Sequence, residues 1–404
     1  EMWIAPVMGS VLIYLSVYIS VPIVLYSVIV ATLWVCSPYF AYNISKNIEH
    51  KQEEIGEEDK NYLRTIARRT YAYYEDFSNE ENNYLAPDNY QESPFKGVAY
   101  RTSPTNIGMG LMSHVIAYDM GYITLFDLVD KIDITLYNMR DLEKVKGHYL
   151  NWYDTRSKKT LYPRYISTVD NGNFLANLWV VKSTLQEVRN NQLIRKEEVK
   201  AIHDIYRIIE EENPSVSCRF NDDININEYT STLSDICVKI TNFKEELCED
   251  DKNKSEINYW IYKIIKEINK KINNYDCIFE GLDKLYSKDF LEGVPNIHEI
   301  IKRIEDHKQS NNGSISGELN AKLLYLKDYE SKIDNIISEI DEITNEMDFS
   351  FLYDDERKLF YIGYNVDEDS FGETYYDLLA SEARIASFIS IAKNDVPKEN
   401  WFSL

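Results

Sequence analysis

The sequence predicts a mainly α-helical protein: an N-terminal transmembrane helical hairpin, then part of an (α/α)6-type toroid with a helical insertion and a small β-hairpin. Three observations support this fold class. Residues 2–45 contain no charged side chain, apolar residues then recur at helical spacing over most of the chain, and polar loops alternate with these helices. With 404 residues, 44% of them hydrophobic, the chain can build a large core.

Charge and cysteine content exclude two classes of site. Acidic residues outnumber basic ones by 67 to 44, and the net charge of −23 repels a phosphate backbone, so we expect no nucleic acid partner. The cysteines form no Cys-x-x-Cys pair and have no histidine at zinc-site spacing. They are Cys36, Cys218, Cys237, Cys248 and Cys277. We therefore expect reduced thiols, no metal ion and no organic cofactor.

The first 45 residues are expected to cross the cytoplasmic (inner) membrane twice. A spanning helix needs about 20 apolar residues, and passes at roughly 3–19 and 21–39 fit this run, with Ser20 and Pro22 at the turn. The alternative is one long tilted or kinked helix. Basic residues follow the run, which predicts that the downstream part faces the cytoplasm. They are Lys46, His50, Lys51, Arg64, Arg68 and Arg69.

Residues 46–198 are predicted to form the first part of the toroid. Helix signals recur in this range, among them an N-cap at Ser103 and a capping box formed by Thr124 with Asp127. The expected helices run over 62–77, from Pro104 to Gly121, from Thr124 past Met139, and from Thr168 toward Val188.

Residues 199–346 are predicted to be a helical insertion packed on the toroid. Their composition shifts to Lys, Glu, Asn and Ile with helical periodicity, and an Asn-Ser-Gly stretch at 309–317 forms a loop. A partner-binding coiled coil is the alternative, but no strict heptad is sustained. Residues 347–404 continue the toroid. They contain the β-hairpin, which is expected over 349–353 and 359–364 with a polar turn between.

Three polar loops between residues 98 and 173 have the composition of a carbohydrate site. They cover 98–108, 147–155 and 163–173, and each places amides, carboxylates, Arg or aromatic rings beside an apolar helix. Aromatic rings stack on sugar faces, whereas Asn, Asp and Arg bind hydroxyls. The loops therefore predict a cleft for a polyhydroxylated ligand.

In the first loop, the candidate ligand-binding residues lie before or within the first turn of a helix. The free backbone amides of that turn can bind ligand oxygens. The candidates are Arg101, Thr102, Thr105 and Asn106. The alternative is that Thr102 and Ser103 only cap this helix while Arg101 pairs with a carboxylate. Gly108 and Gly110 each cost about 1 kcal/mol of helix propensity. Close helix packing around the cleft would explain that cost.

In the second loop, Trp152 and Tyr153 are candidates for a stacking platform, with Asn151 and Asp154 binding hydroxyls. A place in the core is the alternative for both rings. His148 has the chemistry of a general base, but a single histidine is more often structural, and we do not assign it a role.

The third loop contributes Tyr165, Asp170 and Asn173, where Gly172 would let the backbone approach a ligand. The alternative for this loop is an ordinary helix start, capped by Thr168 and stabilised by the charge of Asp170. Farther along, Glu382 is the first candidate for a buried carboxylate with a raised pKa.

Several of these residues fall in blocks that resemble the glycoamylase-like domain of bacterial cyclic β-1,2-glucan synthases. The blocks are RTSPTNIG (101–108), GHYLNWYDT (147–155), STVDNGN (167–173), DFSFLYDDERKLFYIGYNV (348–366) and YYDLLASEARIASFISIAKNDVP (375–397). They follow the family's order. The resemblance implies an (α/α)-barrel that acts on β-1,2-glucan, as part of the cyclising transglycosylase of a membrane-bound synthase. It adds weight to ligand contact by Arg101 and Asn106.

The resemblance also bears on catalysis. Glycoside chemistry needs two carboxylates across the scissile bond, and the family's pair is expected beyond Leu404, so the chain is expected to be an inactive fragment. Within it, the carboxylate candidates are Glu382 and Asp170. The expected partners are β-1,2-glucan, the lipid bilayer and the remaining domains of the same polypeptide. The alternatives are an endo-β-1,2-glucanase and a non-catalytic, membrane-tethered glucan-binding fragment.

Overall fold

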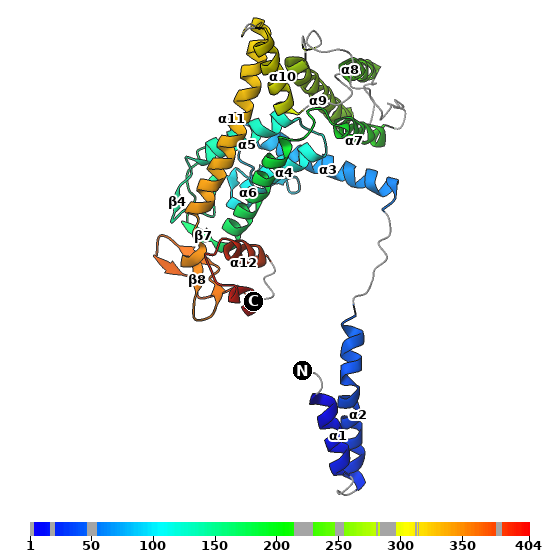
Figure 1. Cartoon of the computed structure of the whole chain (residues 1–404), viewed down its shortest axis with the longest axis vertical. Helices are drawn as coiled ribbons and strands as arrows, with labels where there is room; N and C mark the ends of the chain where they lie inside the picture. The colour runs from blue at the N-terminus through cyan, green and yellow to red at the C-terminus, as the bar shows by residue number, and fades with distance from the viewer. Residues whose placement is uncertain are drawn as a thin grey trace. The chain divides into compact units, whose positions relative to one another are not determined.

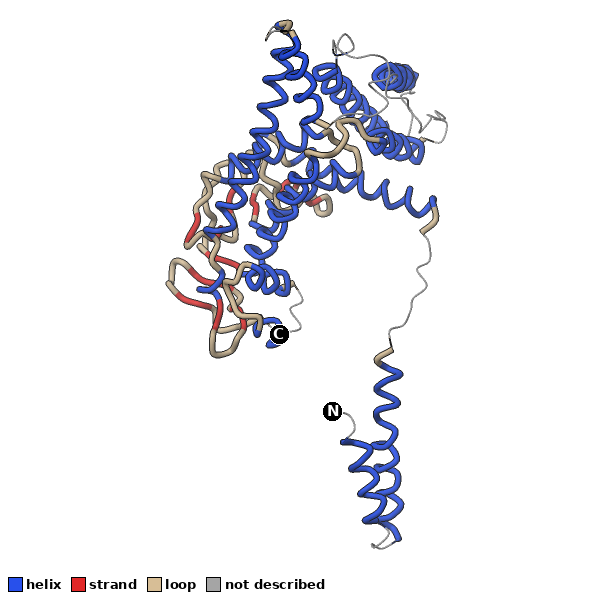
Figure 2. The backbone as a smooth tube through the Cα atoms, viewed as in Figure 1, coloured by secondary structure: helices blue, strands red, loops and turns tan. Residues whose placement is uncertain are grey.

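The structure is a computed structural model in which helices predominate and the strands are short (Figures 1 and 2). It describes residues 4–16, 21–46, 55–213, 229–246, 254–279, 282, 296–311, 313, 315–376 and 382–404. The chain forms two compact units, Glu1–Glu57 and Glu58–Leu404. The predicted division of the second unit at residues 199 and 347 stays a prediction.

The first unit contains the predicted helical hairpin, formed by α1 (Ile4–Ser16) and α2 (Val21–Ile44) packed against each other. At 1.5 Å per residue, the 13 residues of α1 extend about 20 Å, whereas the hydrocarbon core of a bilayer is about 30 Å thick. Over the described ranges, the structure contains no helix with both the length and the apolar character needed to cross a membrane. The membrane-crossing part of the prediction is therefore not supported, and the cytoplasmic orientation stays a prediction.

The four helices expected in the first half of the second unit are present. They are α3 (Glu57–Phe77), α4 (Pro104–Asp119), α5 (Leu125–Met139) and α6 (Thr168–Val188). Their caps follow from the sequence: the Asn106 backbone N–H donates to Ser103 Oγ over 3.2 Å. Thr124 and Asp127 exchange the two bonds of a capping box, at 3.2 and 3.3 Å. These local hydrogen bonds explain why the helix starts were predictable.

Helices α5, α4, α6 and α12 (Ala383–Ala392) pack in that order in space. Glycines allow close contact between them. A Cβ on Gly108 would lie 2.8 Å from Asn177 Nδ2, and one on Gly172 would lie 2.5 Å from Ala386 Cβ. Close packing therefore explains Gly108, as predicted. The prediction for Gly172 was wrong, because α12 fills the space that we assigned to a ligand.

Helices also occupy the predicted insertion. They are α7 (Lys196–Glu212), α8 (Tyr229–Glu246), α9 (Lys254–Phe279), α10 (Ile297–Ser310) and α11 (Gly317–Glu346). Helix α9 packs on α7 and α8, whereas α11 lies across α5 and α6 (Figure 1). The expected loop lies where α10 ends and α11 begins.

The strands are more numerous than the single predicted hairpin. That hairpin is formed by β8 (Tyr353–Asp354) and β9 (Leu359–Phe360), while residues Phe349–Leu352 form a 3-10 helix instead of a strand. Further antiparallel pairs join β1 (Tyr90–Gln91) to β2 (Gly97–Val98), β3 (Arg101–Thr102) to β6 (Tyr153–Asp154), and β4 (Lys144–Val145) to β5 (His148–Tyr149). The largest sheet has the order β11 (Ser370–Phe371), β10 (Gly363–Asn365), β7 (Tyr165–Ser167). Strands of two or three residues are too short for a visible period-two pattern.

Candidate carbohydrate-binding site

A short strand pair joins the first predicted loop to the second. In it, Arg101 lies opposite Asp154, and Thr102 lies opposite Tyr153. This register places the Arg101 guanidinium over the indole ring of Trp152, 4.6 Å from its centroid. The pairing therefore brings together a cation and an aromatic ring that are 51 residues apart in the sequence.

Asp88, which the sequence analysis missed, holds two of the predicted residues. Its Oδ2 accepts hydrogen bonds from Arg101 Nε at 3.1 Å and Nη2 at 2.8 Å, and its Oδ1 accepts one from Asn106 Nδ2 at 3.3 Å. The alternative that Arg101 pairs with a carboxylate is therefore confirmed. Arg101 is still half exposed, and its Nη1 makes no hydrogen bond to a described residue. A ligand hydroxyl can reach such a group.

The second loop is tied to the third through Asn151. Its side-chain amide satisfies its neighbours when the oxygen and nitrogen are exchanged: the nitrogen then donates to Asp170 Oδ2 at 3.0 Å, and the oxygen accepts from Trp152 Nε1 at 3.2 Å. Its backbone N–H also donates to the Tyr165 carbonyl at 2.7 Å. Together with Asp88 and Arg101, these contacts form an unbroken series across all three loops, which we call the polar wall. The wall runs through Asp88, Arg101, Trp152, Asn151 and Asp170.

Tyr376 lies at the end of the polar wall and was also missed. Burial is the main reason that its pKa is raised, and the nearby charges of Glu382 and Asp170 raise it further. Its hydroxyl also interacts with Tyr165 and Ser167. The phenol is therefore protonated at neutral pH and can donate a hydrogen bond. Tyr376 lies within one of the resembling blocks, but nothing in its spacing distinguishes it from Tyr375.

Tyr153 is a core residue and cannot serve as a stacking platform. Its side chain is fully buried, and its hydroxyl donates to the Glu143 carbonyl and accepts from the Leu150 N–H, both at 2.6 Å. Thr102 is also fully buried and donates to the Ala86 carbonyl at 2.6 Å. The structure therefore corrects both predictions, because neither side chain is open to a ligand.

Asp154 shapes a turn at the edge of the site. Its Oδ1 accepts hydrogen bonds from the Ser157 N–H at 2.8 Å, the Ser157 hydroxyl at 2.9 Å and the Arg156 N–H at 3.1 Å. Partial burial acts to raise the pKa of Asp154, but these hydrogen bonds lower it overall. The carboxylate is therefore charged and mainly holds the loop.

The start of α6 is capped by Ser167 rather than by Thr168. The Asp170 N–H donates to Ser167 Oγ at 3.2 Å, while the Thr168 hydroxyl donates to the Tyr361 carbonyl at 2.7 Å. Asp170 lies in the first turn, where the positive end of the helix favours its charge. Asn173, one turn on, keeps a buried Oδ1 without a partner among the described residues.

The remaining candidates differ in exposure. Thr105 is half-buried in the first turn of α4 and makes no hydrogen bond to a described residue through its side chain. Glu382 is exposed at the N-cap position of α12, and its side chain forms no capping bond. The expectation of a buried Glu382 was wrong, because α12 begins directly after it and leaves the side chain at the surface.

His148 is a structural residue of the core. Its ring is fully buried between Phe349 and Phe351, and its Nε2 donates to the Asp348 carbonyl at 2.8 Å. Burial lowers the pKa of His148 to about 4. The imidazole is therefore neutral at pH 7, and it lies within the core.

Comparison with known proteins tests the resemblance. No family model matches the chain. Over 411 residues, covering all of this chain, it is 30% identical to the cyclic β-(1,2)-glucan synthase NdvB of Rhizobium meliloti strain 1021. The resemblance to the cyclic β-1,2-glucan synthase family is confirmed. The chain spans 14% of the length of that synthase.

Two solved structures are also similar to the chain. They are putative glucoamylases from Bacteroides fragilis and Bacteroides caccae, 17% and 19% identical. The matches cover 40% and 37% of this chain and 38% and 37% of those chains, each with a TM-score of 0.28. Four residues of the polar wall, Arg101, Asn151, Trp152 and Asp170, fall in the blocks at 101–108, 147–155 and 167–173, whereas Asp88 lies outside them.

Proposed function

We propose that the chain is the part of a cyclic β-1,2-glucan synthase that forms the glucan-binding wall of its cyclising transglycosylase domain. The observation that carries this proposal is the unbroken series of contacts from Asp88 through Arg101, Trp152 and Asn151 to Asp170. Residues of three separate loops are held together there, and the buried Asn171 side chain of the third loop also bonds to the Tyr149 backbone of the second. Such an arrangement suits a ligand with many hydroxyls.

The chemistry of the polar wall fits a glucan chain. Arg101 covers one face of the Trp152 indole, so a sugar would stack on the opposite face. Hydroxyls would then meet the Arg101 guanidinium, the Asn151 amide and the Asp170 carboxylate. Helices α4 and α6 both begin beside these residues, and serine side chains already accept from one first-turn N–H group of each helix, those of Asn106 and Asp170.

The proposed role is to bind and orient glucan. Cleavage of a glycosidic bond needs a pair of carboxylates, about 5 Å apart for retention and farther apart for inversion. Asp170 belongs to the polar wall, and the charges of Asp170 and Glu382 both act on Tyr376 at its end. We propose that the remaining domains of the same polypeptide complete the reaction.

Calorimetric titration with linear β-1,2-glucan tests this function. Replacing Trp152 with Ala should weaken binding by about 1–3 kcal/mol, since aromatic side chains dominate binding hot spots. Trp401→Ala is the matched control, because Trp401 lies on α13 (Glu399–Ser403), outside the polar wall, and is 41% exposed.

Circular dichroism should show that both variants remain folded. Unchanged affinity of Trp152→Ala, or an equal loss in Trp401→Ala, would contradict the proposal. Release of shorter glucans by the wild-type chain, abolished by Asp170→Asn, would instead favour the endo-β-1,2-glucanase alternative.

A further inference from the structure

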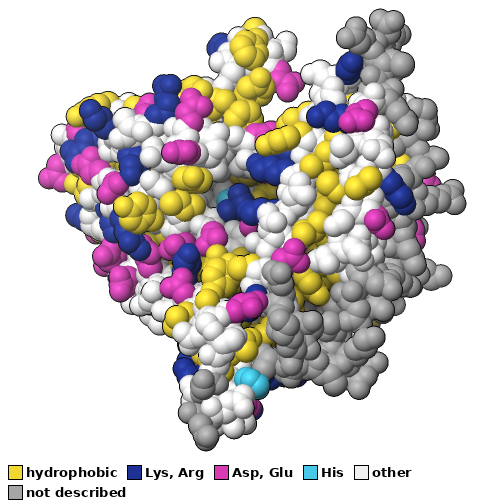
Figure 3. Space-filling view, turned by 90° about the horizontal axis from the view of Figure 1, so that it is seen from above, with side chains coloured by type: hydrophobic (Ala, Val, Ile, Leu, Met, Phe, Trp, Pro, Cys, Tyr) yellow, Lys and Arg dark blue, Asp and Glu magenta, His cyan; other side chains and the backbone are white. Residues whose placement is uncertain are grey.

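A cavity lies between α3, α5 and α9, and none of its lining residues belongs to the polar wall. Its volume is about 90 Å³, which is enough for several water molecules or one small anion. Basic side chains dominate its lining. They are Arg68 on α3, Lys131 on α5, and Lys266, Lys270 and Lys271 on α9. Figure 3 shows Lys and Arg side chains beside a hollow on one face, although the chain as a whole is acidic.

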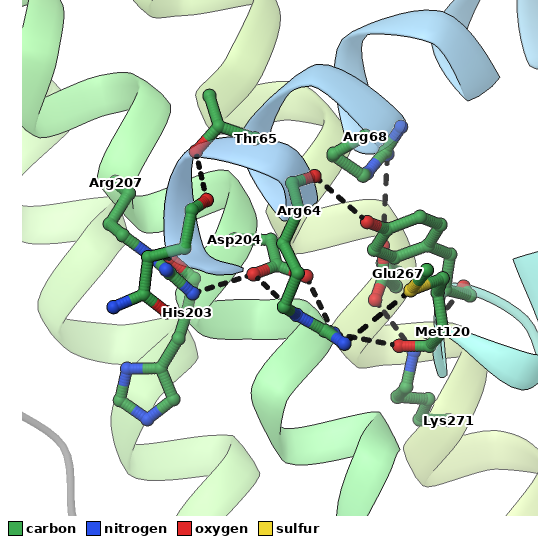
Figure 4. A network of polar contacts seen from close by, with 11 residues as sticks. Arg64, Thr65, Arg68, Met120, His203, Asp204, Arg207, Glu267 and Lys271 are labelled. Carbon is green, nitrogen blue, oxygen red and sulfur yellow. Dashed lines mark hydrogen bonds and ion pairs between the residues drawn. The ribbon is translucent and has the colours of Figure 1, made fainter. Parts of the chain in front are cut away.

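The carboxylates that line this cavity already have basic partners. Asp127 pairs with Lys270 at 2.5 Å, and Glu267 pairs with Lys271 at 2.7 Å. Glu75 pairs with Arg68 at 3.2 Å and with Lys263 at 3.0 Å. Figure 4 shows Arg68, Glu267 and Lys271 converging from α3 and α9. Five basic groups therefore face three carboxylates, and positive charge remains.

Arg68 has unused hydrogen-bond donors at this place. Only 1% of the side chain is exposed, yet its Nε and Nη1 have no partner among the described residues. The rings of Tyr71, Tyr122 and Trp260 surround the guanidinium at 5.3 to 5.8 Å. Rings can cover the faces of the guanidinium but cannot accept its in-plane N–H bonds well. Buried donors without an acceptor are costly, and a bound anion would supply the acceptors.

Lys131 adds a further positive charge to the lining, within reach of the charges of Glu75 and Asp127. It lines the cavity, and within the described chain it forms no ion pair. Burial lowers the pKa of Lys131, and the positive charge of Lys270 lowers it further. An anion between Lys131 and Lys270 would raise the pKa of Lys131 again, because it would replace the lost contact with water and offset the repulsion between the two cations.

We propose that this cavity binds a small tetrahedral oxyanion of the phosphate or sulfate type. The anion would complete the hydrogen bonding of Arg68 and neutralise Lys131. It would thereby strengthen the contact of α9 with α3 and α5. The site is separate from the polar wall, so the proposal does not depend on glucan binding.

Thermal unfolding of the full chain in inorganic phosphate tests the proposal, with sodium chloride at equal ionic strength as the reference. Phosphate should raise Tm beyond the chloride value, and the rise should grow with the logarithm of its concentration. Lys131→Met should abolish the rise. This variant should stay folded without phosphate, because it removes a partly buried charge that forms no ion pair with a described residue. Lys327→Met is the matched control, since Lys327 pairs with Glu305 away from the cavity.

Titration calorimetry of the wild type with phosphate gives a readout that needs no variant, and one saturable site is expected. An equal rise in Tm with a hexose phosphate would support the same oxyanion site with the sugar outside the cavity. A rise with inorganic phosphate alone would support a free anion. The proposal is overturned if phosphate has no effect beyond that of chloride, or if Lys131→Met keeps the full rise.

Discussion

At the scale of single residues, the site depends on whether neighbouring side chains of a loop face the core or the surface. Trp152 and Tyr153 are neighbours in sequence, but Tyr153 is fully buried whereas Trp152 stays partly exposed beneath Arg101. The residue types alone predicted which loops come together in the structure. They did not predict this difference, because Trp152 lies just before β6, and a strand of two residues gives no visible alternation in the sequence. Asp88 was missed for a similar reason, since one carboxylate in a polar loop has no distinguishing spacing.

Replacing Asp88 with Ala should weaken glucan binding about tenfold, a loss of about 1.4 kcal/mol. Its carboxylate orients both Arg101 and Asn106. Stability should change by less than about 1 kcal/mol, because the ion pair is partly exposed. Calorimetry and thermal unfolding measure the two effects. The control is Asp341→Ala, which removes a comparable surface pair with Lys182. Equal affinity of the two variants would argue against a positioning role for Asp88.

His148 should make stability depend on pH. Its pKa is about 4 in the folded chain, against about 6.5 when unfolded. Between these values the unfolded state holds more protons, so the free energy of unfolding falls as pH decreases from 6.5 toward 4, by roughly 3 kcal/mol. His114, whose pKa burial also lowers, adds to the fall in the same direction. Denaturant unfolding at several pH values should show a smaller fall for His148→Gln. An unchanged fall would mean that this imidazole is accessible to protons in the native state.

At the scale of helices and strands, local signals predicted well and long-range contacts did not. Helix α5 begins where a reciprocal cap between Thr124 and Asp127 satisfies its free amides, and both partners lie within one turn. The partner of Gly172 is Ala386, more than 200 residues away, and no local pattern shows it. The uncharged N-terminal stretch correctly predicted paired helices, but an absence of charge does not establish that they cross a membrane.

Gly172→Ala should destabilise the second unit by about 1–3 kcal/mol, since the added methyl would meet α12. Its Cβ would lie 2.5 Å from Ala386 Cβ and 2.7 Å from Ala386 Cα. The control is Gly317→Ala at the start of α11, where nothing lies within 4 Å and the higher helix propensity of Ala should be neutral or stabilising. Chemical denaturation compares the two variants. A Gly172→Ala protein as stable as the control would show that α6 and α12 do not approach this closely.

At the scale of the whole molecule, sequence and structure converge on one region. The loops at 98–108, 147–155 and 163–173 were selected by composition, and the structure joins them through Arg101 and Asn151. The similarity to a cyclic β-(1,2)-glucan synthase runs along the entire chain. The central claim is therefore that these loops act together as one glucan-binding surface.

Hydrogen–deuterium exchange with and without linear β-1,2-glucan tests this claim most directly. We predict that backbone amides of the three loops become protected together when glucan binds. The exchange of amides in α8 and α10, which contribute no residue to the polar wall, should be unchanged. The Trp152→Ala variant should lose the protection in all three loops at once. Protection confined to one loop, or located only outside these loops, would contradict the account.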